Sequence, residues 1–171
     1  HAGKQTCLDA IEVSNKPVAI SHANPNFFHK SKRNIDTDIL QKLVKKNGFI
    51  GLSLYPYHLK NLGDCTIEDF CEMIKELVNL IGEDNIGIGS DLCLNWPDDV
   101  VMWMRNGKWT KNIDYGESKD KNPKWPKLPS WYKQPSDLNN LFYLMCENNI
   151  PEKVSTKIIG QNWFNFMKNQ F

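Results

Sequence analysis

Three residues whose side chains bind metals or carry protons stand next to short apolar stretches. His22 and Asp91 end the stretches at residues 17–22 and 86–91, and His1 stands before a helix-like segment. Barrels of alternating strands and helices keep their catalytic groups at the carboxyl ends of such strands. Neutral imidazole and ionised carboxylate are good ligands and proton carriers for a divalent cation. The pattern therefore predicts a metal-dependent hydrolase site.

Each candidate residue also has an ordinary structural interpretation. A single histidine at a strand end is more often a hydrogen-bonded structural residue than a metal ligand, and this applies to His22, His29 and His58 alike. Asp91 can cap a helix or a turn. Arg33 can cap a helix or form a surface ion pair, or it can grip a substrate carboxylate with its two-pronged guanidinium. Only the convergence of several of these residues favours a functional site.

The elements that must position these residues follow from the apolar pattern. Strands are predicted at residues 17–22, 49–54 and 86–91, and they are apolar throughout, as in parallel sheets covered by helices on both faces. Gly51, Gly87 and Gly89 lie inside these strands and indicate close approach of other backbone.

Helical spacing of apolar residues predicts the elements between and after the strands. A helix-like segment covers residues 4–14, and Thr66 is expected to cap a helix that has Asp69 at the capping-box position. Further helices are predicted at residues 36–47, 98–105, 136–148 and 151–168.

Strands and helices in alternation at this spacing indicate right-handed βαβ units. A complete (β/α)8 barrel needs eight strands and about 250 residues. We therefore expect an α/β fold in which residues 1–171 form the C-terminal part of a TIM barrel whose N-terminal half is missing. Residues 94–136 hold five of the six tryptophans and five of the nine prolines. They are expected to form a long ordered loop, inserted in the barrel, that roofs the pocket and excludes water.

The bulk composition excludes several classes of partner. Twenty-one basic residues balance 20 acidic ones, for a net charge of +1, so neither nucleic acid nor an anionic membrane is expected as a partner. The apolar runs are too short to span a bilayer, so this segment gives no indication of membrane association. The five cysteines form no Cys-x-x-Cys pair and no Asn-x-Ser/Thr acceptor occurs, which slightly favours a cytoplasmic location. A homodimer is left open.

Five motifs occur in one order along the chain: Ser-His22-Ala-Asn, Lys-Arg33-Asn-Ile-Asp, Gly-x-Ile-Gly-Leu-x-x-Tyr55, Gly-Ile-Gly-Ser-Asp91 and Ile-Ile-Gly-x-Asn162-Trp. In this order and spacing, the sequence resembles the C-terminal half of the zinc-dependent membrane (renal-type) dipeptidases, which are (β/α)8 metallopeptidases of bacteria and animals. The likeness covers nearly all of the chain, but residues 94–136 resemble only a bacterial subgroup.

The resemblance implies a two-zinc site bridged by a carboxylate and a hydroxide, with dipeptides as substrates. It implies that His1 and His22 bind the second zinc, that Arg33 holds the substrate's C-terminal carboxylate, and that Asp91 is the proton shuttle. His58 falls near a family position that often holds a substrate-contacting tyrosine. The ligands of the first zinc and the bridging glutamate would lie upstream of this chain.

One departure from the family pattern concerns the last strand. Most members read Gly-x-Asp-Phe-Asp-Gly, whereas this chain reads Gly-Ser-Asp91-Leu-Cys93-Leu, so the proton shuttle is kept and the second aspartate is a cysteine. The departure leaves the substrate preference open. We expect part of a metallodipeptidase that is inactive without its N-terminal half. The alternatives are a non-catalytic protein on the same barrel and a related metal-dependent amidohydrolase.

Overall fold

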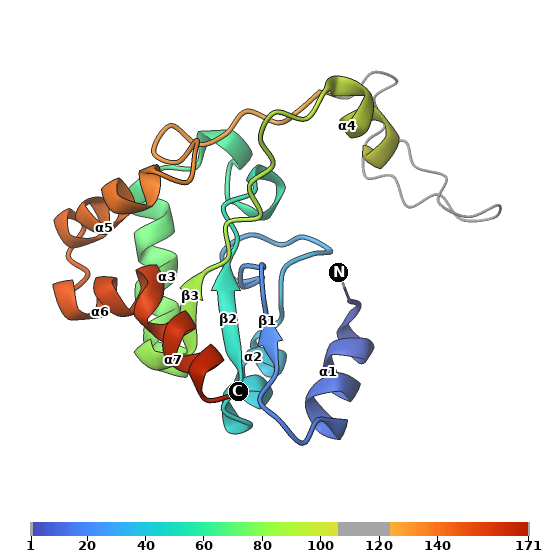
Figure 1. Ribbon diagram of the computed structural model, residues 1–171, viewed down its shortest axis with the longest axis vertical. Coiled ribbons are helices and arrows are strands. Elements are labelled where there is room, and N and C mark those ends of the chain that lie inside the picture. Colours follow the sequence, from blue (N-terminus) through green and yellow to red (C-terminus); the bar gives the residue numbers. More distant parts are fainter. Residues whose placement is uncertain (1, 106–123, 171) are drawn as a thin grey trace. The chain divides into compact units, whose positions relative to one another are not determined.

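The computed structural model describes residues 2–105 and 124–170, and in this part of the chain three parallel strands form one sheet (Figure 1). The strands are β1 (Ala19–Ile20), β2 (Phe49–Leu52) and β3 (Ile86–Ile88), in the spatial order β1-β2-β3. Ala19 lies opposite Phe49, and Ile50 lies opposite Ile86. The predicted α/β fold with parallel strands is confirmed.

The helices follow the predicted order, with ends that differ by a few residues. α1 (Lys4–Val13) precedes the sheet, α2 (Thr37–Lys45) connects β1 to β2, and α3 (Ile67–Ile81) connects β2 to β3. Short 3-10 helices lie at Pro56–His58, Leu62–Asp64 and Glu83–Asn85. The later elements are α4 (Asp98–Arg105), α5 (Asp137–Glu147), α6 (Glu152–Thr156), a π-helical turn (Lys157–Gln161) and α7 (Asn162–Lys168).

One face of the sheet carries the main hydrophobic core. Ile50 and Leu52 are fully buried there, in a cluster to which α2 and α3 contribute Leu40, Leu43, Ile74 and Leu77. The start of α3 is fixed by the residue before it, because the Thr66 side chain accepts a hydrogen bond of 3.1 Å from the backbone N–H of Asp69. The predicted cap at Thr66 is confirmed.

The opposite face of the sheet is covered by α7, and this explains the glycines of the strands. Phe49 points to this side and packs against Trp163 at a ring-centroid distance of 4.3 Å. A Cβ atom added at Gly51 or Gly87 would lie 3.0 or 2.7 Å from the Trp163 ring. The strand glycines were predicted to allow close approach of other backbone. At Gly51 and Gly87, the groups that come close include the indole ring of Trp163.

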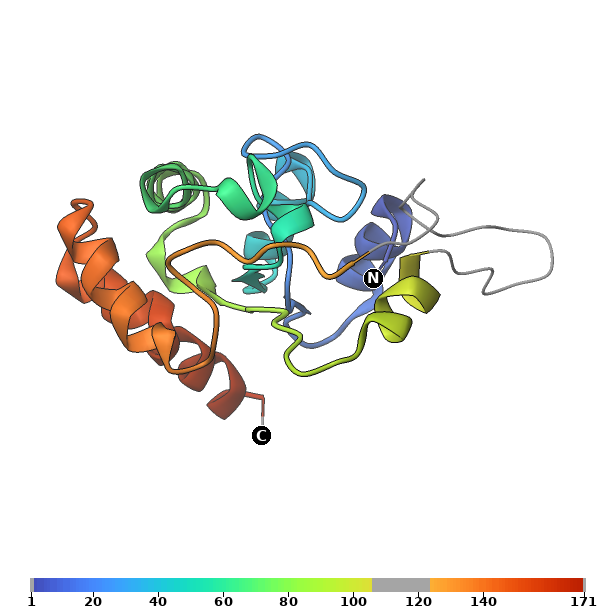
Figure 2. The same ribbon diagram turned by 90° about the horizontal axis from the view of Figure 1, so that it is seen from above.

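The free edge of β3 is also covered by α7. Because Gly89 donates from its N–H to Leu52 in β2, the alternate residues Ile86 and Ile88 present their carbonyl groups to the other edge. The Asn162 side chain donates to the Ile86 carbonyl at 2.8 Å, and the Trp163 indole donates to the Ile88 carbonyl at 2.8 Å. Figures 1 and 2 show the C-terminal helices beside β3.

The chain divides into two compact units, residues 1–92 with 128–171, and residues 93–127. The second unit contains α4 and a hydrogen bond of 2.9 Å from the Trp125 indole to the Trp96 carbonyl. Trp131, from the end of the predicted insertion, belongs to the first unit, where it is buried against Phe70. The roof over the pocket stays a prediction. In the described part of the chain, no helix combines the length and the apolar character that a membrane span needs.

Candidate active site

His22 lies just after β1, where the strand runs into the loop at residues 23–35. Its Nδ1 atom is 2.8 Å from the Ser21 hydroxyl oxygen. The half-buried imidazole lines a cavity of about 200 Å³ between α1 and β1. If Nδ1 carries the proton and donates to Ser21, Nε2 presents the lone pair that a cation takes.

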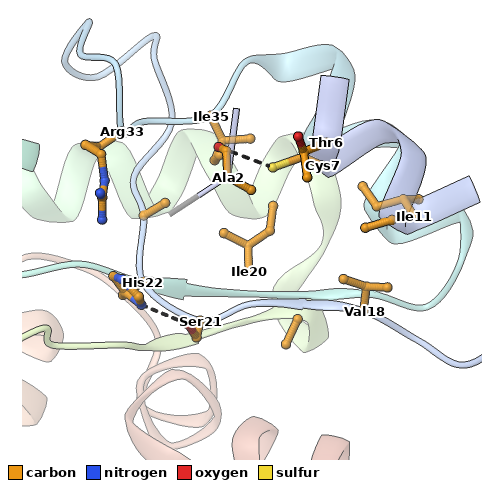
Figure 3. Close-up of a pocket in the computed structure, with 13 residues that line it drawn as sticks. Ala2, Thr6, Cys7, Ile11, Val18, Ile20, Ser21, His22, Arg33 and Ile35 are labelled. Carbon is orange, nitrogen blue, oxygen red and sulfur yellow. Dashed lines mark hydrogen bonds between the residues drawn. The ribbon is translucent and has the colours of Figure 1, made fainter. Parts of the chain in front are cut away.

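Arg33 lies on the loop between β1 and α2 and lines the same cavity. Figure 3 shows its side chain extending from the loop towards His22, with the aliphatic side chains of Ile20 and Ile35, which line the same cavity, to the right of both. The guanidinium is always protonated in proteins and offers several N–H donors in one plane. This end of the cavity therefore suits an anionic group, and a planar carboxylate above all.

Asp91 follows β3 and comes within electrostatic reach of both other residues. Burial raises the pKa of its carboxyl group above the usual value, and the charges of His22 and Arg33 act in the opposite direction. The structure thus brings His22, Arg33 and Asp91 together at the carboxyl ends of β1 and β3. Asp91 is not among the residues that line the cavity itself.

The backbone at Asp91 adopts a conformation that few residue types tolerate. Its φ angle is +51°, in the left-handed region that glycine, asparagine and aspartate occupy most readily. Such conformations cost free energy and are concentrated at functional sites. The turn here directs the chain out of the sheet directly after β3.

Tyr132 supports this turn, and the sequence pattern gave no signal for it. Its side chain is 3% exposed and hydrogen-bonds to Ser90, the residue before Asp91. The next residue towards the N-terminus, Trp131, donates from its indole to the Cys65 carbonyl at 2.8 Å. A segment about 40 residues further along the chain thus braces the end of β3.

The other histidines have different surroundings. His58 is 3% exposed, and its Nδ1 lies 2.7 Å from the Ser53 hydroxyl oxygen. It does not line the cavity, so the substrate contact predicted for it stays a prediction. His29 is half-buried on the loop between β1 and α2. His1, the second predicted zinc ligand, lies outside the described residues.

The donor set available for a metal is incomplete in this part of the protein. Among residues 2–105 and 124–170, no three His, Cys, Asp or Glu side chains are grouped closely enough to hold an ion. Burial raises the pKa values of the Cys65 and Cys71 thiols to about 12, so both are neutral packing groups rather than thiolate ligands. His22 fits a zinc ion as one ligand, and further ligands must come from elsewhere.

Comparison with known proteins fits this arrangement. Residues 1–98, more than half of the chain, match the family described as membrane dipeptidase, peptidase family M19. The chain belongs to that family. Dipeptidase tcpJ of Claviceps purpurea is 26% identical over 127 residues, which are 67% of this chain and 30% of the relative. A dipeptidase of Aspergillus terreus is 34% identical over 94 residues, 53% of this chain and 23% of the relative.

Solved structures of similar fold extend the match over nearly the whole chain. An amidohydrolase from Pseudomonas aeruginosa is 29% identical, with a TM-score of 0.84 over 98% of this chain and 50% of its own. A metallopeptidase from Rhodobacter sphaeroides, crystallised with a phosphinate mimic of the dipeptide L-Ala-D-Ala, is 18% identical, with a TM-score of 0.75 over 100% of this chain and 41% of its own. The chain therefore spans half or less of the length of both structures.

Proposed function

We propose that the protein containing this chain is a zinc-dependent dipeptidase. The observation that carries the proposal is the meeting of His22, Arg33 and Asp91 at one end of the sheet, in a chain of the membrane dipeptidase family. An imidazole, a guanidinium and a carboxylate are the groups that a peptidase of free dipeptides needs for a metal, a substrate carboxylate and a proton. His1 and residues that precede this chain would complete the two-zinc site.

Bound zinc supplies a water molecule of lowered pKa and a Lewis acid for the scissile carbonyl. The chain's own residues have three tasks beside it. His22 would hold an ion through Nε2, with Ser21 fixing its ring through Nδ1. Asp91, which interacts electrostatically with His22 and Arg33, would transfer a proton to the leaving amine. Arg33 pairs with the C-terminal carboxylate of the substrate and so favours dipeptides over longer peptides.

Replacing Arg33 with alanine should impair substrate binding more than turnover. Loss of a charge-assisted hydrogen bond costs about 1.5–3 kcal/mol, so KM for a dipeptide should rise roughly 10- to 100-fold with little change in kcat. We define the carboxylate preference as kcat/KM for a dipeptide divided by kcat/KM for its C-terminal amide. The carboxylate preference should be high in the wild-type protein and low in Arg33→Ala.

Lys32→Ala is the matched control, because Lys32 is an exposed cation on the same loop and does not line the cavity. It removes the same formal charge without removing a group aimed at the substrate. If both variants lowered the carboxylate preference equally, the general positive charge of the loop would matter and the specific pairing with Arg33 would be refuted.

Residues 1–171 alone should not hydrolyse dipeptides. With His1 and His22, this segment supplies two of the predicted zinc ligands, whereas a catalytic zinc usually has three protein ligands and an open position. The measurement is release of free amino acid from a simple dipeptide by the purified segment in zinc-containing buffer, with the intact protein as positive control. Zinc-dependent cleavage by the segment, abolished by a chelator, would show that its own residues complete the site.

A related metal-dependent amidohydrolase is the second candidate. It is favoured by the Pseudomonas aeruginosa structure, which is described as an amidohydrolase and has the highest TM-score of those given above. The two candidates differ in what lies beyond the scissile amide. A dipeptidase requires a free C-terminal carboxylate for Arg33, so equal rates on dipeptides and on amides without that carboxylate would favour the second candidate. Hydrolysis of neither, by zinc-loaded intact protein, would favour a non-catalytic role.

A further inference from the structure

The loop that carries Arg33 is tied to the sheet by two buried asparagines. Asn24 is 0% exposed and Asn34 is 6% exposed. Neither lines the cavity. Burying an amide is costly unless its donors and its acceptor all find partners. The contacts of these two side chains therefore show what they are holding.

Asn24 connects the end of β1 to the end of β2. Its amide nitrogen donates to the carbonyl oxygens of Ser53 at 2.9 Å and of His58 at 3.1 Å. Its side-chain oxygen accepts from the N–H of Ser53 at 3.1 Å. Both donors and the acceptor are thus engaged, and the start of the loop is fixed to the segment that follows β2.

Asn34, the neighbour of Arg33 in sequence, closes the loop from its other end. Its amide nitrogen donates to the carbonyl of His29 at 2.7 Å, within the loop, and to the carbonyl of His58 at 3.0 Å. Its side-chain oxygen accepts from the N–H of Asn24 at 3.1 Å. The two side-chain amides therefore share the His58 carbonyl, and the backbone of Asn24 bonds to the side chain of Asn34, so that the two residues act as one unit.

The backbone of Arg33 itself is held by this arrangement. The Ser31 hydroxyl accepts from the N–H of Arg33 at 3.3 Å and from the N–H of Asn34 at 3.2 Å. The loop ends are closed by backbone hydrogen bonds of 2.8 Å, from Asn26 to Ile35 and from Ile35 to Asn24. The long Arg33 side chain thus starts from a fixed Cα position, although it belongs to the connection of 16 residues, 21–36, between β1 and α2.

We propose that Asn34 and Asn24 are positioning residues for substrate binding, which set the place of the Arg33 guanidinium at the cavity through the shared His58 carbonyl. The inference rests on the role proposed for Arg33 in holding the substrate carboxylate. It also gives the buried His58 a role in the site. Its backbone carbonyl, rather than its imidazole, holds the two asparagines in place. A displacement of about 1 Å in a binding group can cost up to 100-fold in rate.

The test compares the carboxylate preference of four zinc-loaded full-length proteins: wild type, Arg33→Ala, Asn34→Ala and the double variant. Asn34→Ala should lower the carboxylate preference roughly tenfold or more, although it leaves the guanidinium in the protein. In the Arg33→Ala background it should cause no further loss, because residues that act as a unit are non-additive. A merely structural role would lower stability without changing this ratio.

Asn162→Ala is the matched control for the loss of a buried amide. Asn162 is 3% exposed and donates to two carbonyl groups, of Glu83 and Ile86, at 2.7 and 2.8 Å. Its replacement should lower the melting temperature to a similar extent as Asn34→Ala and leave the carboxylate preference at the wild-type value. An equal fall in the control would mean that any loss of packing changes the ratio, and the proposal would be overturned.

Two outcomes distinguish the positioning role of Asn34 from the proposed role of Arg33. A carboxylate preference that is unchanged in Arg33→Ala would refute the role of Arg33 itself. A preference that falls in Arg33→Ala but stays at the wild-type value in folded Asn34→Ala would overturn the positioning role alone. If Asn34→Ala does not fold, Ser31→Ala replaces it, because this half-buried hydroxyl bonds directly to the Arg33 N–H. An unchanged preference in Ser31→Ala would then overturn the proposal.

Discussion

Asp91→Asn should reduce turnover by roughly 10²–10⁴-fold, the range that a positioned acid–base group contributes. Asparagine keeps the shape of the side chain and tolerates the left-handed backbone at this position, where φ is +51°. It cannot accept and release a proton at neutral pH. Because the change removes a proton carrier and not a ligand, KM and zinc content should stay close to the wild-type values. The measurements are steady-state kinetics on a dipeptide and metal analysis of the purified variant.

The thermal stability of the zinc-free protein is the control for Asp91→Asn. Burial raises the pKa of the Asp91 carboxyl, so the folded protein binds a proton there more tightly than the unfolded chain does. The ionised carboxylate therefore lowers stability at pH values above its raised pKa, and this cost disappears below the ordinary aspartate pKa of about 3.9. At neutral pH, zinc-free Asp91→Asn should melt no lower than wild type. A loss of zinc in the variant would instead identify Asp91 as a ligand.

Gly89→Ala should destabilise the protein by about 3 kcal/mol or more, at the upper end of the cost of overpacking. A Cβ atom at this position would lie 1.8 Å from the Ser21 carbonyl oxygen, which is backbone and cannot rotate away. The strand ends must therefore separate. Because His22 follows Ser21 directly, the variant should also lose dipeptidase activity in the fraction that stays folded. Thermal unfolding and kinetics on the same preparation measure both effects.

Gly160→Ala is the matched control, since nothing lies within 4 Å of the Cβ that it would add. Alanine is the better helix former, so this change should be neutral or slightly stabilising. If Gly89→Ala had the same melting temperature as Gly160→Ala, the close approach of the Gly89 and Ser21 backbones would be refuted.

Features encoded by neighbouring residues were predictable from the sequence. The helix that starts after Thr66 could be predicted because its cap and its apolar spacing are both local, and both are present. The strands were predicted correctly in place but too long. Only Ala19–Ile20 of the stretch at residues 17–22 has strand geometry, although the N–H of Ala23 still donates to the Gly51 carbonyl of β2 at 2.9 Å. An apolar stretch predicts burial better than it predicts where strand pairing ends.

Features that depend on contacts between distant segments could not be predicted in this way. The bond between Tyr132 and Ser90, and the sharing of the His58 carbonyl by Asn24 and Asn34, join residues that local pattern does not relate. The single helix predicted at residues 151–168 contains a π-helical turn at Lys157–Gln161, directly before the residues that contact β3. Histidine and aspartate were identified by their chemistry, whereas asparagine and tyrosine have too many ordinary roles to stand out.

The side chains that cover the edge of β3 make α7 a protection of residues 1–171 against self-association. Without Asn162 and Trp163, the carbonyl groups of Ile86 and Ile88 would form an open edge on an apolar strand. Exposed edges of this kind recruit strands from other chains and start aggregates. Residues 1–161 alone, which lack α7, should thus precipitate during expression more than residues 1–171, although both segments keep His22, Arg33 and Asp91. Expression yields of such truncations would report on this edge and not on catalysis.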